Sequence, residues 1–141
     1  MEKSIFYDTA IDLVLLEDAV DNDAYESAVV DMQGYDGVCF VAAVGLGAVT
    51  TSVLTVEQDD SAAMTSAATL AGAEANVVTA VAADGLALVE VVKPTARYVR
   101  AVLTVPDITA VPAAIIAIRF RARSVPRANE GVSVVSPGPA A

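Results

Sequence analysis

The sequence predicts an all-β protein, an antiparallel β-sandwich of about seven short strands with extended N- and C-terminal arms. Three observations lead to this fold class. The chain is 55% hydrophobic but only 5% aromatic, and its apolar residues are mostly alanine and valine, of which valine favours strands. Short apolar or alternating segments recur along the chain, with Gly, Asp and Pro between them. The length of 141 residues is that of one domain.

We divide the chain into three parts by composition. They are an N-terminal arm or short helix over residues 1–23, a β-sandwich domain over 24–124 and a Pro/Gly-rich C-terminal tail over 125–141. The composition of the last part is typical of a tail that lies along another surface or extends into solvent.

Two structures are open for the first part. Ile11, Val14 and Leu15 have the three- and four-residue spacing of a helix. The same segment could equally be an extended arm that anchors on a neighbouring molecule through Leu13, Leu15 and Leu16.

Seven segments of the sandwich are expected as strands. They are residues 25–33, 38–44, 50–58, 76–82, 86–93, 97–105 and 113–124. Segment 38–44 is apolar on both faces, which indicates a central strand. In segment 97–105, Val99 and Leu103 alternate with Arg100, which indicates one buried face.

Turn signals separate these segments. Gly34 and Gly37 can both adopt a positive φ, so a turn is expected there. Asp84-Gly85 is a hairpin signal between two apolar segments. The Ala-rich residues 62–75 are expected as a loop with a short strand at 67–70.

The last strand carries a row of arginines. At strand period, Ile116, Ile118 and Phe120 fall on one face, which we expect to be buried. Arg119, Arg121 and Arg123 fall on the other. On an acidic protein this row indicates a docking surface, although a solvated outer face is the alternative.

Charge is unevenly distributed along the chain. Residues 1–60 hold 13 of the 18 acids and one of the eight bases, whereas residues 61–141 hold the other five acids and seven bases. Such polarity suits contact between the acidic surface of one subunit and the basic surface of another. Neutralisation of one half by the other within a single sandwich is equally compatible. The net charge of −10 disfavours nucleic acid as a partner.

The chain lacks the residues of most catalytic sites. It has no histidine and one cysteine, Cys39, so Ser-His-Asp and Cys-His arrangements are excluded. The acids at 21–26 and at Asp59-Asp60 lack the spacing of a calcium loop. We therefore expect no enzyme activity, no cofactor and no metal site. Without an apolar run of about 18 residues, no membrane partner is expected.

Three segments together resemble the small head proteins of tailed bacteriophages. They are residues 27–37 (SAVVDMQGYDG), 54–61 (LTVEQDDS) and 93–104 (KPTARYVRAVLT). The likeness depends on their order and spacing, and it covers about residues 13–127.

The resemblance implies a capsid decoration, or cement, protein. Such a protein binds the outer surface of the major capsid protein shell and stabilises it. Its partners would be the major capsid protein and further copies of itself, as a dimer or trimer. It would act on the capsid exterior of the virion after synthesis in the host cytoplasm.

We expect the interfaces to use three leucines and six arginines. These residues are Leu13, Leu15, Leu16, Arg97, Arg100, Arg119, Arg121, Arg123 and Arg127. Alternatives are another phage structural component (a tail tube, a head-tail connector or a head-fibre base) or a glycan-binding β-sandwich module. The absence of tryptophan weighs against a glycan site, because sugars commonly stack on large aromatic rings.

Overall fold

The fold is all-β, as the sequence predicts. The computed structural model describes residues 8–19, 23–45, 52–81, 84–105 and 111–121. Within these ranges the chain forms ten strands and no helix. The strands are β1 (Ala10–Ala19), β2 (Asp23–Glu26), β3 (Val30–Asp31), β4 (Gly37–Val44), β5 (Val53–Asp59), β6 (Ala68–Asn76), β7 (Val78–Val81), β8 (Asp84–Val92), β9 (Tyr98–Val105) and β10 (Val111–Phe120).

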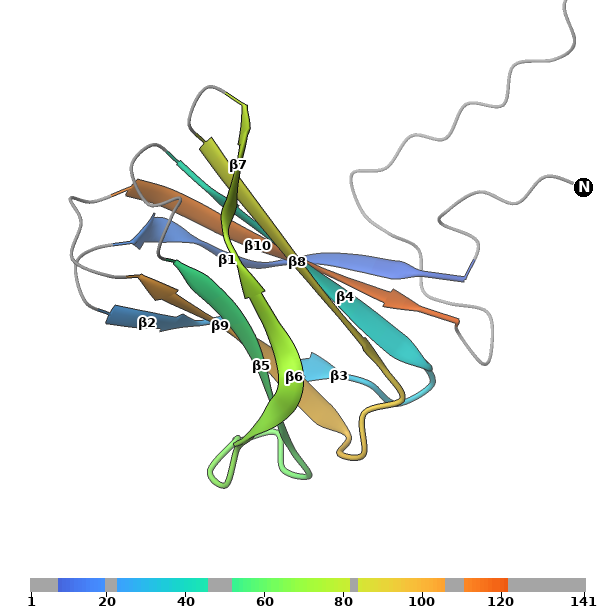
Figure 1. Cartoon of the computed structure of the whole chain (residues 1–141). Coiled ribbons are helices and arrows are strands. Elements are labelled where there is room, and N and C mark those ends of the chain that lie inside the picture. The colour runs from blue at the N-terminus through green and yellow to red at the C-terminus, as the bar shows by residue number, and fades with distance from the viewer. Residues whose placement is uncertain (1–7, 20–22, 46–51, 82–83, 106–110, 122–141) are drawn as a thin grey trace, which may run out of the picture.

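The strands form two antiparallel sheets that pack as two layers (Figure 1). Sheet A has the order β1-β10-β4-β8-β7, and sheet B has the order β2-β9-β5-β6, with β3 also paired to β9. The inner faces of both sheets supply the core. Its largest fully buried side chains are Phe40, Leu54, Leu103 and Ile115. The predicted β-sandwich is therefore confirmed, with β4 as a central strand.

The N-terminal segment is a strand and not a helix. β1 pairs with β10 at the edge of sheet A, and its register shifts between Leu13 and Leu15. This bulge inserts one residue, so Leu13 and Leu16 share a face although they are three positions apart. Of the residues that suggested a helix, Ile11 pairs with Ile118 on the outer face, whereas Val14, at the bulge, and Leu15 both pack against the core. Residues 1–7 of the predicted arm, and all of the predicted tail after 125, lie outside the described residues.

The prediction of which face of β10 is buried was wrong. Ile115 and Ala117 are fully buried, whereas Ile116 is exposed. The inner face therefore continues to Arg119, at the end of the sandwich, where the guanidinium reaches Asp12. Both faces of β10 carry isoleucine, so the apolar residues do not show which face is buried. The prediction therefore depended on the arginines, which were placed outward. Arg121 follows the strand with a left-handed φ of 54°.

The Ala-rich segment is a strand at the edge of sheet B. β6 spans most of the expected loop, and it continues through the buried Val77 into β7 of sheet A (Figure 1). The amide of Val77 donates to the carbonyl oxygen of Ser52 at 2.9 Å. A positive φ of 82° at Gly72 lies where the β5–β6 register is interrupted. One continuous stretch thus belongs to both sheets.

The turns follow the sequence in part. Gly34 has the expected positive φ of 89°, and Tyr35 donates its amide to the carbonyl of Met32 across the turn. Gly37 instead lies within β4, where any Cβ would overlap the ring of Phe120. β7 and β8 form the expected hairpin, but Asp84 pairs with Val81 and belongs to the strand.

The expected strand 25–33 is divided at Ser27. β2 and β3 both pair with β9, and the buried Ser27 lies between them. From there the chain turns aside, and the amide of Ala28 donates to the carbonyl of Val14 in β1 at 2.8 Å. This bond links the segment between β2 and β3 of sheet B to the edge strand β1 of sheet A.

Candidate interaction surfaces

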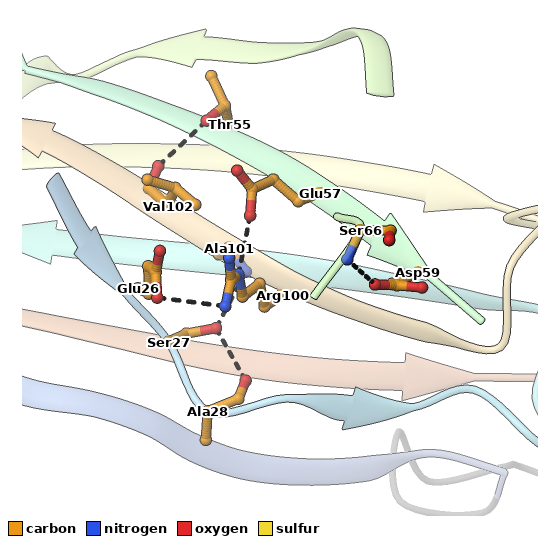
Figure 2. A network of polar contacts seen from close by, with 10 residues as sticks. All are labelled: Glu26, Ser27, Ala28, Thr55, Glu57, Asp59, Ser66, Arg100, Ala101 and Val102. Carbon is orange, nitrogen blue, oxygen red and sulfur yellow. Dashed lines mark hydrogen bonds and ion pairs between the residues drawn. The ribbon is translucent and has the colours of Figure 1, made fainter. Parts of the chain in front are cut away.

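Arg100 on the outer face of sheet B is held by two carboxylates (Figure 2). Its Nε donates to Glu57 directly opposite on β5 at 2.8 Å, and its Nη1 lies 3.2 Å from Glu26 on β2. Arg100 and Glu57 are 16% and 22% exposed, whereas Glu26 is 55% exposed. The Glu57 contact is therefore the stronger of the two, because water screens it less.

Arg97 forms a bidentate ion pair with Asp31. Its Nε and Nη2 donate to the two carboxylate oxygens, each at 2.9 Å. The guanidinium also lies 5.0 Å from the ring centre of Tyr98. The hydrogen bond from Arg97 lowers the pKa of Asp31, and the amide of Gln33 adds to this effect.

Arg119 closes the rim of the sandwich between β1 and β3. Its Nη2 donates to Asp12 at 3.1 Å, and its Nη1 donates to the carbonyl of Asp31 at 3.0 Å. The guanidinium lies 4.6 Å from the ring centre of Tyr35. Its Nε is buried with no hydrogen-bond partner among the described residues.

These contacts bear on the uneven charge of the chain. Each ion pair found among the described residues joins an acid from the first 60 residues to an arginine after residue 96. The two halves therefore neutralise each other within one sandwich to this extent. Arg121 is exposed and lies over Phe120, while Arg123 and Arg127 lie outside the described residues. The role of the six arginines at an interface stays a prediction.

The outer face of sheet A is apolar across four strands. The register aligns its side chains in rows that run from β1 through β10 and β4 to β8. The rows are Leu16-Ala114-Ala43-Leu86, Leu13-Ile116-Val41-Leu88 and Ile11-Ile118-Cys39-Glu90, with Phe120-Gly37-Val92 at the end. We call this set the outer apolar face. Glu90 is the one charged side chain in these rows.

Several members of this face are strongly exposed for apolar residues. The exposed fractions are 60% for Leu13, 71% for Leu16, 53% for Leu88, 49% for Val92 and 38% for Ile116. Leu15, which was predicted with Leu13 and Leu16, instead points inward and packs against the core. Sequence reasoning missed Leu88, Val92 and Ile116. The signal for this face was that β4, β8 and β10 carry apolar residues at outward as well as inward positions.

A shallow hollow of about 320 Å³ lies at one end of this face. It is lined mainly by apolar residues, among them Leu16, Ala43, Pro112 and Ala114, and also by Asp84. Its few polar groups give it little means to orient a small polar ligand. The hollow therefore extends the outer apolar face.

The loop after β5 uses its acid structurally. The two carboxylate oxygens of Asp59 accept the amides of Ser61 at 3.1 Å and Ser66 at 2.7 Å (Figure 2 shows the second). These hydrogen bonds, that from Ser61 first, lower the pKa of Asp59. Among the described residues no three His, Cys, Asp or Glu side chains cluster as a metal site would need. The described part of the chain also contains no apolar helix that could span a membrane.

Comparisons with known proteins add one structural likeness. No family model and no curated protein matches the chain. A solved structure, the PBSX exported protein XepA, is similar with a TM-score of 0.57 and 16% sequence identity. The match covers 91% of this chain but 43% of the XepA chain, so this chain spans less than half the length of its neighbour. At this identity the likeness supports the sandwich fold.

Proposed function

We propose that this chain is a structural virion protein without enzymatic activity. In this proposal it is a capsid decoration, or cement, protein that binds the outer surface of the major capsid protein shell and stabilises it. The resemblance of residues 27–37, 54–61 and 93–104 to phage head proteins supports it. The fold likeness to the PBSX exported protein XepA supports the coarser idea of a phage-associated protein.

The observation that carries the proposal is the contrast between the two outer faces of the sandwich. The outer face of sheet B holds Arg100 between Glu57 and Glu26, whereas that of sheet A is apolar. Exposed apolar area on this scale is typical of surfaces that bind other proteins. A protein with one apolar and one charged face is suited to adhering to neighbours.

A cement protein stabilises a shell by contacting several subunits at once. Each contact can be weak, because linkage through one rigid domain makes the later contacts intramolecular. The acidic chain, at −10, would meet basic groups of the shell. Arg121, with Arg123 and Arg127 after it, would meet acids of a neighbouring subunit.

Co-sedimentation with shells of the cognate major capsid protein tests the function. We expect saturable binding at a high copy number per shell, raised resistance of the shell to heat, and weakening of binding with added salt. A copy number of only a few would indicate a connector or fibre base instead. Absence of binding to any such shell, or turnover of a small molecule by the purified protein, would overturn the proposal.

Point substitutions test the arginines without removing a strand. Arg121→Glu reverses an exposed charge, whereas a change at Arg119 would break the internal pair with Asp12. We expect Arg121→Glu to weaken shell binding and to reduce its salt dependence. Lys93→Glu, an exposed charge reversal in a different loop, is the matched control. Equal binding by the two variants would reject the arginine contact.

A further inference from the structure

The outer apolar face is too large and too continuous to be incidental. All four rows cross β10, β4 and β8, and three of them also include β1. Leu13, Ile116, Val41 and Leu88 form the central row. A soluble domain that exposes a contiguous apolar patch of several hundred Å² normally uses it to bind a partner.

The size of the face matches a protein interface. The four strands have eight to ten residues each. With strands about 4.8 Å apart and about 3.3 Å per residue, the face covers about 500 Å² in projection. Two such faces in contact would bury at least about 1,000 Å², which is the threshold for a specific interface.

Charge indicates what covers the face. Two copies of a chain with net charge −10 repel each other wherever their acids meet. The four rows of this face carry one acid, Glu90, at the β8 end of its row, and the hollow that extends the face adds Asp84. The face is therefore a surface on which two copies can approach with little repulsion. A basic partner would gain little from this face, because it holds few acids.

We propose that the outer apolar face is covered by a second copy of this chain. In the dimer, sheet A of one copy packs face to face on sheet A of the other, about 10 Å apart, as the layers of a sandwich do. A two-fold axis places the same rows in contact from both sides, since a self-complementary patch closes a dimer. Leu13 and Leu88 then lie in the buried interface. The inference rests on the proposed function only for its biological setting.

The test uses the 141-residue chain without any shell, so it fails or succeeds separately from capsid binding. Sedimentation velocity over a wide concentration range should give twice the chain mass of 14.4 kDa. Leu88→Glu places a charge in the central row and should raise the dissociation constant by about tenfold or more. Thr104→Glu, at an exposed position on the outer face of sheet B, is the matched control and should leave the dimer intact.

Cys39 provides a second readout within the same face. It is the sole cysteine of the chain and is partly exposed on β4. Reaction of its thiol with a maleimide should be slower in the wild-type dimer than in the Leu88→Glu monomer at the same pH. Leu88→Ser serves in its place if the charged variant does not fold, as judged by circular dichroism.

Four results would overturn the inference. They are a wild-type monomer at all concentrations, a dimer that Leu88→Glu leaves unchanged, a wild-type trimer, and a monomer that dimerises only after removal of residues 122–141. The last result would mean that the tail of the same chain covers the face. A dimer that forms without any capsid binding would support this inference and contradict the proposed function.

Discussion

Ser27→Ala should destabilise the domain through one buried amide. Ser27 donates its amide to the carbonyl of Ala101 at 2.9 Å, and its hydroxyl oxygen accepts the amide of Ala101 at 2.9 Å (Figure 2). The hydroxyl thus takes the place of a backbone carbonyl as acceptor for Ala101, in the gap between β2 and β3 where strand pairing to β9 is interrupted. Ala101 is fully buried, so water cannot replace the lost acceptor.

The magnitude follows from that unsatisfied amide. A buried donor without a partner costs about 1–3 kcal/mol. The second bond of the hydroxyl, to the carbonyl of Ala28 at 2.9 Å, adds less because Ala28 is exposed and its carbonyl can bind water. We expect the free energy of unfolding to fall by about 1–3 kcal/mol in total, which lowers the melting temperature by at least a few degrees.

Urea unfolding and hydrogen exchange measure this effect. The Ala101 amide should exchange faster in the variant, by about fivefold to a hundredfold for that loss of free energy. Ser66→Ala is the control, because Ser66 is exposed and contributes its backbone amide, not its hydroxyl, to Asp59. A loss below about 0.5 kcal/mol, with unchanged exchange at Ala101, would refute the assigned hydrogen bond.

Two further predictions concern charged pairs. Because Arg97 lowers the pKa of Asp31 in the folded state, the pair stabilises the fold at pH values above about 4 and this stability is lost as the pH falls through the lowered value. Asp31→Asn should therefore be less stable than wild type at pH 7, and urea titrations should show the gap closing in acid; a gap independent of pH would contradict the pair. Glu57→Gln should cost about 1.5 kcal/mol, because it removes the better-buried partner of Arg100, whereas Glu26→Gln should cost less than about 1 kcal/mol. Equal losses in urea unfolding would show that burial does not distinguish the two contacts.

The sequence predicts two kinds of strand best. One kind has an apolar and a polar face, and the other is apolar on both faces. β9 has apolar residues at every inward position and mostly polar residues outward, and β4 is apolar throughout, so both were assigned correctly. β1 was ambiguous because its bulge lets the adjacent Val14 and Leu15 both pack against the core, which breaks the alternation expected of a strand. β6 was missed because its many small residues lie at an exposed edge, where no large apolar side chain marks a buried face.

The candidate surfaces were less predictable than the fold. Arg119 was predicted to lie on an outward docking surface, with a solvated face as the alternative, but strand register places it on the inner side, where it meets Asp12. The partners of Arg97 and Arg100 lie more than 40 residues away in sequence, and only the sheet topology brings them together. The outer apolar face could not be read from one segment, because it arises from four strands aligned by register.

The continuous run from β6 to β7 has a mechanical consequence. Because one stretch of backbone is hydrogen-bonded into sheet B at its start and into sheet A at its end, neither layer can slide past the other without breaking bonds at this corner. A load applied to one layer is therefore passed through the backbone itself to the other. The two layers therefore resist shear as one body.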